Sequence, residues 1–513
     1  MIRFHRNISV QDILLLSLSA WYVISWQTTG CGEVGHAIIQ GFIPYAMLYI
    51  GIRLLAYAEM EFTEISIAVA LGSFCIWESC YGLGQVFGLW PSGSSIFAMT
   101  GHFSNPGPYG GYVASLTAIA LSYLCIHDNI PKFLRVFLIV EVVFGALVLP
   151  ASLSRAAWAG LAIGVGATLA TVRKYRKIAS SHPAICIALV LIIVAIAVGA
   201  IFLKVDSALG RVHIWHMDFR AMFKQPLLGA GPGFGLGTYG IMQENWFMAN
   251  PEEMVTWRAR VAGCPEYAFN ELLGIGMEVG IPGFLLAITV IVVSVITLLL
   301  KHSPLAAGLI CSSVFSCASY PLSFPLFAAL FITLLAIAGV SGNQWPNKYC
   351  KVLSTMAGVG FIFGGCIILY SHRNTKSRPD LHDLFENGRL LYAAERYEES
   401  IEVLTEGRRM SSDIMFGVVI GRCQEALGNM DEAEKEYRAA HYRAPCRLYP
   451  LVRLMRLQVK TGKNKDAIET AESILDMPVN SRHAAMMRLH VETQSCLDSL
   501  IFLTDNAINS AFR

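Results

Sequence analysis

The chain has 513 residues, of which 54% are hydrophobic and only 15% are charged, whereas soluble globular domains carry about 25% charged residues. This composition excludes a soluble enzyme of uniform build, and a net charge of +2 without a long Lys/Arg block argues against a nucleic-acid partner. Residues 374–513 hold 40 of the 76 charged side chains. We therefore predict an all-α protein with a polytopic membrane domain over residues 1–373 and a soluble domain over residues 374–513.

Apolar segments long enough to cross about 30 Å of hydrocarbon predict about eleven transmembrane helices, with ten to twelve as the range. They lie near residues 8–26, 36–57, 65–88, 108–127, 131–150, 154–172, 184–204, 279–300, 304–320, 325–341 and 352–371. Cytoplasmic loops are enriched in Lys and Arg, and the basic residues between these segments share one side if the N-terminus is cytoplasmic. The loop 205–278 is then expected on the periplasmic side of a multi-pass inner-membrane protein.

The same count of spans puts the C-terminal domain on the periplasmic side as well. A cluster of basic residues at the exit of the last span, including Arg373, Lys376 and Arg378, is instead typical of a cytoplasmic flank. The side on which the tail lies therefore stays open at this stage.

Small residues recur through the tail with a period of 33–34. Gly388 precedes Ser400 by 12 residues, Gly421 precedes Ala433 by 12, and Ala467 follows Ala433 by 34. This spacing predicts tetratricopeptide-like helix pairs, with a plain helical bundle as the alternative. Such an array would offer a surface to a protein partner or to a large acceptor.

Two motifs in the membrane half carry polar groups. The segment HFSNPGPYGGYVA at 102–114 predicts a turn before a helix, where Asn105 and free N–H groups could face a ligand. Arg155, in LPASLSRAAWAGL, lies near the end of a predicted span, and an arginine there marks a functional site unless it reaches the interface by snorkelling.

A third motif lies in the predicted outer loop, at residues 210–239. Arg211 and Trp215 share a helical face, a helix should end before Pro226, and a Gly-rich turn follows from Gly229 to Gly237. This turn lacks the strand–helix context of a nucleotide-binding fingerprint. No zinc-type cysteine pairing occurs, so we predict neither a metal nor a cofactor.

Acidic and amide groups cluster where the chain re-enters the membrane, at 264–286. Glu266, Asn270, Glu271 and Glu278 fall there, and Asn270 and Glu278 are eight residues apart, which puts them roughly on one helical face.

The order of these motifs resembles the O-antigen ligase family, which is grouped with O-antigen polymerases and protein O-oligosaccharyltransferases. The motifs are SR, GR-x-x-x-W, PL-x-G-x-G-x-G, FNE-x-L, a Glu-x-Gly-Ile-Pro-Gly helix and SYPLSFPLF, over about 95–330. The resemblance implies a multi-span glycosyltransferase that works without metal or nucleotide. It would move a glycan from undecaprenyl diphosphate to an acceptor hydroxyl on lipid A-core, a growing glycan or a protein, at the outer face of the inner membrane.

The resemblance also implies roles for single residues. Arg155 and Arg211 match the arginines thought to hold the donor diphosphate, and guanidinium groups suit that task because they bind phosphate oxygens in pairs. Asn105, Trp215, His213, Asn270 and Glu278 are the candidate substrate-binding residues.

The chain departs from the family at the expected general base. Many members carry a histidine directly before the Asn of the FNE segment, and here Phe269 stands in that position. Glu266 is the nearest replacement, with Glu271, Glu278, His213 and His216 as alternatives.

Two other classes of function compete with the enzyme. A transporter of glycolipids or solutes would show internal repeats and broken helices at mid-membrane. A scaffold anchored by its membrane half would not need about eleven spans. The enzyme is the favoured interpretation.

Overall fold

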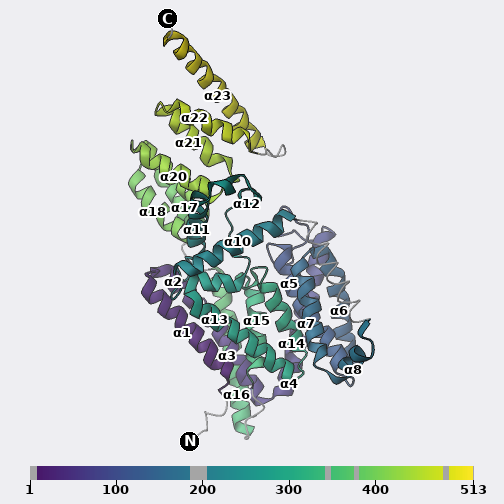
Figure 1. Ribbon diagram of the computed structural model, residues 1–513. Coiled ribbons are helices and arrows are strands. Elements are labelled where there is room, and N and C mark those ends of the chain that lie inside the picture. Colours follow the sequence, from purple (N-terminus) through teal and green to yellow (C-terminus); the bar gives the residue numbers. More distant parts are fainter. Residues whose placement is uncertain (1–7, 185–204, 341–347, 375–380, 478–483, 512–513) are drawn as a thin grey trace. The chain divides into compact units, whose positions relative to one another are not determined.

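The computed structural model describes all residues except 1–7, 185–204, 341–347, 375–380, 478–483 and 512–513 (Figure 1). The described residues form helices joined by turns, without a strand, so the all-α prediction is confirmed for them. The chain divides into two compact units. Unit 1 comprises residues 1–205, 225–232 and 268–378, and unit 2 comprises residues 206–224, 233–267 and 379–513.

Unit 1 is the membrane unit. Its helices are α1 (Val10–Thr29), α2 (Gly32–Gln40), α3 (Ile43–Ala58), α4 (Met60–Val86), α5 (Pro106–Ile126), α6 (Lys132–Ser152), α7 (Arg155–Ala170), α8 (Arg173–Ser181), α13 (Glu271–Leu300), α14 (Leu305–Ser316), η3 (Pro321–Ser323), α15 (Pro325–Ala338) and α16 (Lys348–Asn374). Among the six candidate membrane spans, α5 is the most buried, and it packs against α4, α6, α7 and α14. Glycines let these helices approach closely, since a Cβ at Gly160 would lie 2.8 Å from the carbonyl oxygen of Cys311.

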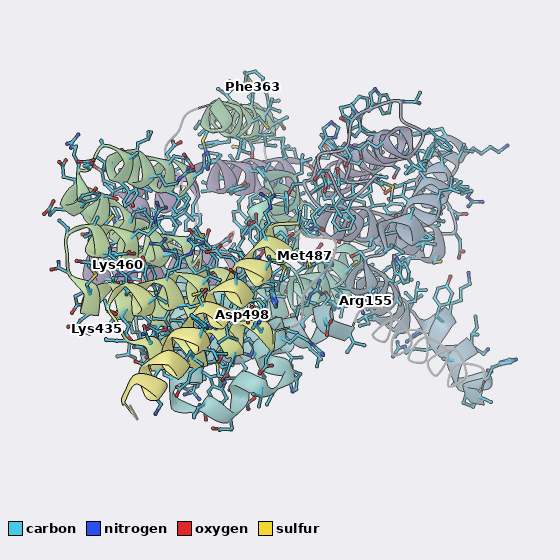
Figure 2. All side chains as sticks on the ribbon, turned by 90° about the horizontal axis from the view of Figure 1, so that it is seen from above. Arg155, Phe363, Lys435, Lys460, Met487 and Asp498 are labelled. Carbon is cyan, nitrogen blue, oxygen red and sulfur yellow. The ribbon has the colours of Figure 1, made fainter. Side chains whose placement is uncertain are left out.

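Six helical segments in the described residues are long and apolar enough to cross a membrane, or seven if the bent pair α7–α8 counts as one span. The six are Gly32–Ala58, Thr63–Val86, Pro106–Ile126, Lys132–Ser152, Glu271–Leu300 and Cys350–Leu369. Helices α14 and α15 are apolar but shorter, and the expected span 184–204 lies almost wholly outside the described residues. The total of eleven spans stays a prediction. Exposed apolar side chains such as Phe363 on α16, labelled in Figure 2, fit a lipid-facing surface.

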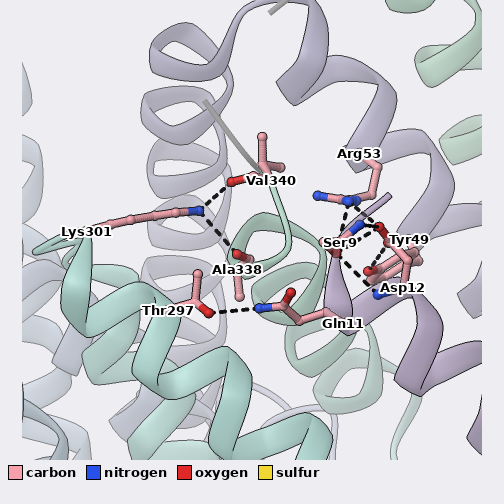
Figure 3. Close-up of polar contacts among 9 residues, drawn as sticks. All are labelled: Ser9, Gln11, Asp12, Tyr49, Arg53, Thr297, Lys301, Ala338 and Val340. Atoms are coloured by element: carbon pink, nitrogen blue, oxygen red, sulfur yellow. Dashed lines mark hydrogen bonds and ion pairs between the residues drawn. The ribbon is translucent and has the colours of Figure 1, made fainter. Parts of the chain in front are cut away.

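One end of unit 1 is closed by a polar network among α1, α3, α13 and α15 (Figure 3). Arg53 pairs with Asp12 at 2.5 Å, and Tyr49 donates a hydrogen bond to the same carboxylate at 2.7 Å. Lys301 donates to the carbonyl oxygens of Ala338 and Val340, at the C-terminal end of α15. Because Arg53 and Asp12 form an ion pair and Lys301 is hydrogen-bonded to backbone carbonyls, these charged groups can lie among apolar helices. We call this the basic end of unit 1.

The other end of unit 1 holds the Gln225–Pro232 segment, and we call it the loop end. Ser25, near the C-terminal end of α1, donates to the carbonyl of Leu228 at 2.7 Å. Helix α16 runs antiparallel to α3, because Ser354 donates to Leu54 near the basic end, while Gly365 approaches the carbonyl of Pro44 at the other. The chain therefore leaves α16 at the loop end, on the side from which α13 begins. The side of the membrane on which the tail lies stays a prediction.

Unit 2 combines the large loop with the tail. It contains α10 (Val205–Lys224, from Asp206), α11 (Gly235–Ala249), η2 (Pro251–Val255), α12 (Trp257–Val261), α17 (Leu381–Ala393), α18 (Tyr397–Met410), α19 (Met415–Ala426), α20 (Met430–Arg443), α21 (Leu448–Lys460), α22 (Asn464–Leu475) and α23 (Ala484–Ala511). Consecutive helices from α17 to α23 pack against each other in chain order (Figure 1). Small residues on one helix pack against large residues on the next. A Cβ on Gly388 of α17 would lie 2.4 Å from the side chain of Leu404 on α18, so a larger residue would not fit there. The tetratricopeptide assignment stays a prediction.

Helix α11 packs on α18 and α20. Arg443 pairs with Glu244 at 2.8 Å, and Gln243 donates a hydrogen bond to the carbonyl of Arg443. A Cβ on Gly237 would lie 1.9 Å from the carbonyl oxygen of Arg409, so only glycine allows this approach. The sequence predicts a domain boundary at residue 374, with the whole loop on the membrane side of it. The compact units differ from this division, because most of the loop is grouped with the tail in unit 2.

Candidate active site

The segment Gln225–Pro232, which contains the first glycines of the Gly-rich turn, is fixed to a break in α13. The amide of Ala230 donates to Met277 at 2.8 Å, that of Gly231 donates to Glu278 at 2.9 Å, and that of Ile281 donates to Pro226 at 2.7 Å. Gly229 has φ +68°, and a Cβ there would lie 2.4 Å from the backbone of Glu278. Close backbone approach, rather than phosphate binding, accounts for the glycine at this position.

The break in α13 follows from its sequence. Pro282 has no N–H and its ring clashes with the carbonyl four residues earlier, at Glu278. Val279 and Gly280 leave helical geometry, with φ of +74° at Gly280. Trp21 donates its indole N–H to the freed carbonyl of Val279 at 2.8 Å. Sequence reasoning did not single out Trp21 or Ser25, although their spacing of four residues places both on one face of α1.

Arg155 is the first residue of α7 and is half-buried, at the position labelled in Figure 2. The turn before it lies on the first turn of α5, since Ser154 donates to the carbonyl of Gly107 at 3.3 Å. Asn105 caps α5, its side-chain oxygen accepting from the amide of Gly107 at 2.8 Å. Its amide –NH₂ group is the part that could meet a ligand, because the oxygen already serves the helix.

The FNE segment begins α13 at the same end. Asn270 is the N-cap, and its side-chain oxygen accepts from the amides of Leu272 and Leu273 at 3.1 Å each. Glu271 accepts a hydrogen bond from the amide of Leu322 at 2.7 Å. Phe269 has a positive φ of 51° and its ring meets Tyr320 edge-on at 5.1 Å. The position of the family's histidine is thus filled by a packed aromatic ring.

Arg211, Trp215 and His213 lie on α10 in unit 2. Arg211 and Trp215 are half-buried, whereas His213 is fully buried against Phe247. The Nε2 atom of His213 lies 2.9 Å from the side-chain oxygen of Gln243, and burial lowers the pKa of His213 to about 4. This histidine is neutral at pH 7 and has no surface to offer a substrate.

Glu266 also belongs to unit 2 and is exposed to solvent. The assignment of Glu266 as the general base stays a prediction. The ring hydroxyl of the next residue is more enclosed, and burial raises the pKa of Tyr267. Glu278 remains half-buried beside the break in α13.

The sequence-predicted site residues are therefore divided between the units. Unit 1 gathers Asn105, Arg155, Asn270 and Glu278 at its loop end, and unit 2 holds Arg211, His213, Trp215 and Glu266. Within the described residues, no cluster of three or more His, Cys, Asp or Glu side chains could hold a metal ion.

These features define a helical membrane protein in which four of the candidate residues lie at the loop end of unit 1, the end that also carries the break in α13. Residues 140–288 match the family model described as O-Antigen ligase. That stretch contains Arg155, Arg211, the Gly-rich turn and the break in α13, and it supports a membrane enzyme that transfers glycans in the manner of a ligase. A search of curated proteins found no match to this chain.

Proposed function

We propose that this protein transfers a glycan from undecaprenyl diphosphate to an acceptor hydroxyl at the outer face of the inner membrane. The observation that carries the proposal is the O-antigen ligase match at residues 140–288. This stretch includes both arginines that the resemblance assigns to the donor. A lipid-linked donor also suits an arginine such as Arg155, which lies where a membrane helix ends.

Each arginine has a clear chemical task in such a reaction. The bond between the sugar and the diphosphate breaks with its electron pair on the phosphate oxygen, so negative charge grows on the leaving group. A guanidinium can neutralise that charge through two parallel hydrogen bonds. We propose that Arg155 and Arg211 both serve the donor, and that Asn105, Trp215, Asn270 and Glu278 help to bind substrates. Glu266 is the candidate for the general base that lies nearest in sequence to the position of the family's histidine.

The sides of the membrane follow from charge. Arg53 and Lys301 lie at the basic end, and Lys174 in α8 pairs with Asp128 in the α5–α6 connection. Because basic residues stay in the cytoplasm, we propose that the basic end is cytoplasmic. The loop end, and with it the tail, would then be periplasmic.

The acceptor distinguishes three related activities. We propose a ligase that uses lipid A-core, with a polymerase that extends a glycan and a protein oligosaccharyltransferase as the alternatives within the same chemistry. A tetratricopeptide-like tail on the acceptor side could bind a large acceptor or a protein partner.

Purified full-length protein in lipid nanodiscs provides the test. The donor would be an undecaprenyl-diphosphate-linked glycan, offered in turn with lipid A-core, a free glycan and a Ser/Thr peptide. Glycan transfer with release of undecaprenyl diphosphate is expected for one acceptor. Absence of transfer to all three, by protein that binds the donor, would contradict the proposal. Profiling of surface glycans and glycoproteins after gene deletion would name the acceptor in cells.

A further inference from the structure

An exposed histidine and a buried carboxylate form a pair at the loop end of unit 1. The Nδ1 atom of His102 lies 2.8 Å from one oxygen of Glu78, and the His102 backbone amide donates to the other oxygen at 3.1 Å. The side chain of Glu78 is 2% exposed and that of His102 is 41% exposed. The carboxylate is therefore anchored inside, while the imidazole reaches the surface.

The pair lies at the same end of unit 1 as Arg155 and Phe269. Phe103, next to His102, packs against Phe324 with ring centroids 5.2 Å apart. Phe324 in turn contacts Tyr320, with ring centroids 5.9 Å apart, and Tyr320 contacts Phe269, with ring centroids 5.1 Å apart. The turn before Arg155 packs on the first turn of α5, which starts four residues after His102. His102 thus shares an end of unit 1 with Arg155 and with the position where the family carries its base.

Aromatic rings surround the imidazole. His102 stacks on Tyr81 at 4.0 Å and on Trp77 at 6.3 Å, and Tyr81 stacks in turn on Trp90 at 5.1 Å. Trp77 and Trp90 are both exposed. Tryptophan and tyrosine gather at the level of lipid head groups, which is also the depth of the diphosphate of a lipid-linked donor.

The arrangement fixes which nitrogen can act as a base. With the Nδ1 proton donated to Glu78, the lone pair is on Nε2, and in the described chain that atom has no hydrogen-bond partner. The titratable groups that face the pair are Tyr81 on α4 and Tyr109 and Tyr112 on α5. The hydroxyl of Tyr109 donates to the backbone carbonyl of Glu78 at 2.9 Å. No cation among these neighbours competes for the carboxylate.

We propose that His102, oriented by Glu78, is the general base of the glycan transfer, in place of the histidine that Phe269 replaces. The proposal rests on the proposed function. The acceptor oxygen forms a bond to the anomeric carbon, and the bond from that carbon to the diphosphate oxygen breaks with its electron pair on the diphosphate. The acceptor proton passes to Nε2, and the resulting imidazolium is balanced by the Glu78 carboxylate. Release of that proton to water restores the neutral ring.

His102→Ala in the full-length protein is the direct test. General-base catalysis contributes about 10²–10⁴-fold, so the transfer rate should fall by about that factor while the donor dissociation constant stays within about threefold. Added imidazole should restore part of the rate, which the loss of a merely structural side chain would not allow. Glu78→Gln, which keeps a hydrogen-bond acceptor without the charge, should also lower kcat and alter the acid limb of the pH–rate profile.

His36→Ala is the matched control. His36 is another exposed histidine stacked on a tryptophan, Trp26, but its hydrogen-bond partner is Gln40 rather than a carboxylate. It should retain the wild-type rate and show no response to imidazole.

Three results would decide against the proposal. Wild-type transfer by His102→Ala would overturn it, and a simultaneous loss in Glu266→Gln would return the base to Glu266. A His102→Ala protein that loses donor binding and is not rescued by imidazole would make His102 structural. Inactive wild-type protein would instead overturn the proposed function, and this inference with it.

Discussion

At the scale of single residues, the two arginines assigned to the donor are separately testable. Arg155→Ala and Arg211→Ala should each lower transfer by about 10²–10³-fold, because one contact to a developing charge is lost. Arg→Lys should recover only part of the rate, since an ammonium cannot bind two oxygens in parallel. Transfer of a radiolabelled glycan to the acceptor measures the effect.

Arg260→Ala controls for loss of positive charge in the same loop. Arg260 is exposed and pairs with Asp206 at 2.9 Å on the surface of unit 2, where an ion pair adds little to stability. It should transfer at the wild-type rate. Normal transfer by either Arg155→Ala or Arg211→Ala would remove that arginine from the site.

Buried histidines make unit 2 sensitive to acid. Burial lowers the pKa of His213 and of His441 to about 4 each, against about 6.5 in an unfolded chain. The stability that each contributes is present above pH 6.5 and is lost as the pH falls towards 4. At pH 5 the loss is about 2 kcal/mol for each histidine.

The expected result is an unfolding temperature of the full-length protein that falls between pH 7 and pH 5. His213→Gln, which keeps a side-chain donor for Gln243, should flatten that fall. An equally steep fall in His213→Gln and in the wild type would mean that other groups govern the acid response.

At the scale of elements, the contact between the Gly-rich turn and α13 depends on glycine. A Cβ at Gly280 would lie 2.4 Å from the carbonyl oxygen of Leu227, and the residue has φ +74°. Gly280→Ala should therefore reduce both the folded yield and the transfer rate, because backbone at the site must move. Positive φ alone costs about 1–2 kcal/mol.

Two other glycines serve as controls that separate the cost of positive φ from the cost of losing the close backbone approach. Gly88 has φ +72° with open space around it, and Gly166 has open space and ordinary φ. Gly88→Ala should show only the conformational cost, and Gly166→Ala should behave as wild type. If Gly280→Ala matched Gly88→Ala in folded yield and transfer, the close approach would not matter.

The helices themselves were the part most readily predicted from the sequence. Apolar runs such as 108–127 and 131–150 match α5 and α6 closely, because a buried or lipid-facing helix needs a long apolar segment. The expected helix 279–300 begins earlier, at Glu271, because the capping side chain of Asn270 starts it and the break at Gly280 lies inside. Local pattern could not show that break, since it depends on backbone contacts with Pro226 and Ala230 about 50 residues away.

The candidate site was predicted less completely than the helices. The sequence favours Asn105 and Asn270 as ligand groups, and in the structure each of them caps a helix. The chemistry of histidine favours His213 as a substrate-binding residue, but its burial against Phe247 depends on α11, which the sequence around His213 does not reveal. Glu78 lies in an apolar helix, where an ionisable residue is itself a functional signal.

At the scale of the whole molecule, the tail should be needed for activity. A chain that stops after Arg378 leaves Glu244 without Arg443 and exposes the face of α11 that packs on α20. We expect rapid proteolysis within residues 233–267 and loss of transfer. A chain that stops after Met477 keeps α17–α22 and serves as the control. Equal protease resistance of the two truncated proteins would contradict this expectation.

The topology can be checked with single cysteines in a protein without its native ones. Cysteines at the exposed positions Glu252 and Gly462 should both react with an impermeant thiol reagent in intact spheroplasts. One at Asn129, in the α5–α6 connection, should react only after the membrane is ruptured. Opposite reactivity at Glu252 and Gly462 would refute a shared side.

The interleaving of unit 2 along the chain also sets an order of assembly during synthesis. Gln243 and Glu244 meet Arg443 only after about 200 further residues have been made, which takes about 10–40 s at about 5–20 residues per second. Until then the face of α11 that packs on α18 and α20 lacks these two helices. We therefore expect chaperones to hold the nascent loop until α20 has been made.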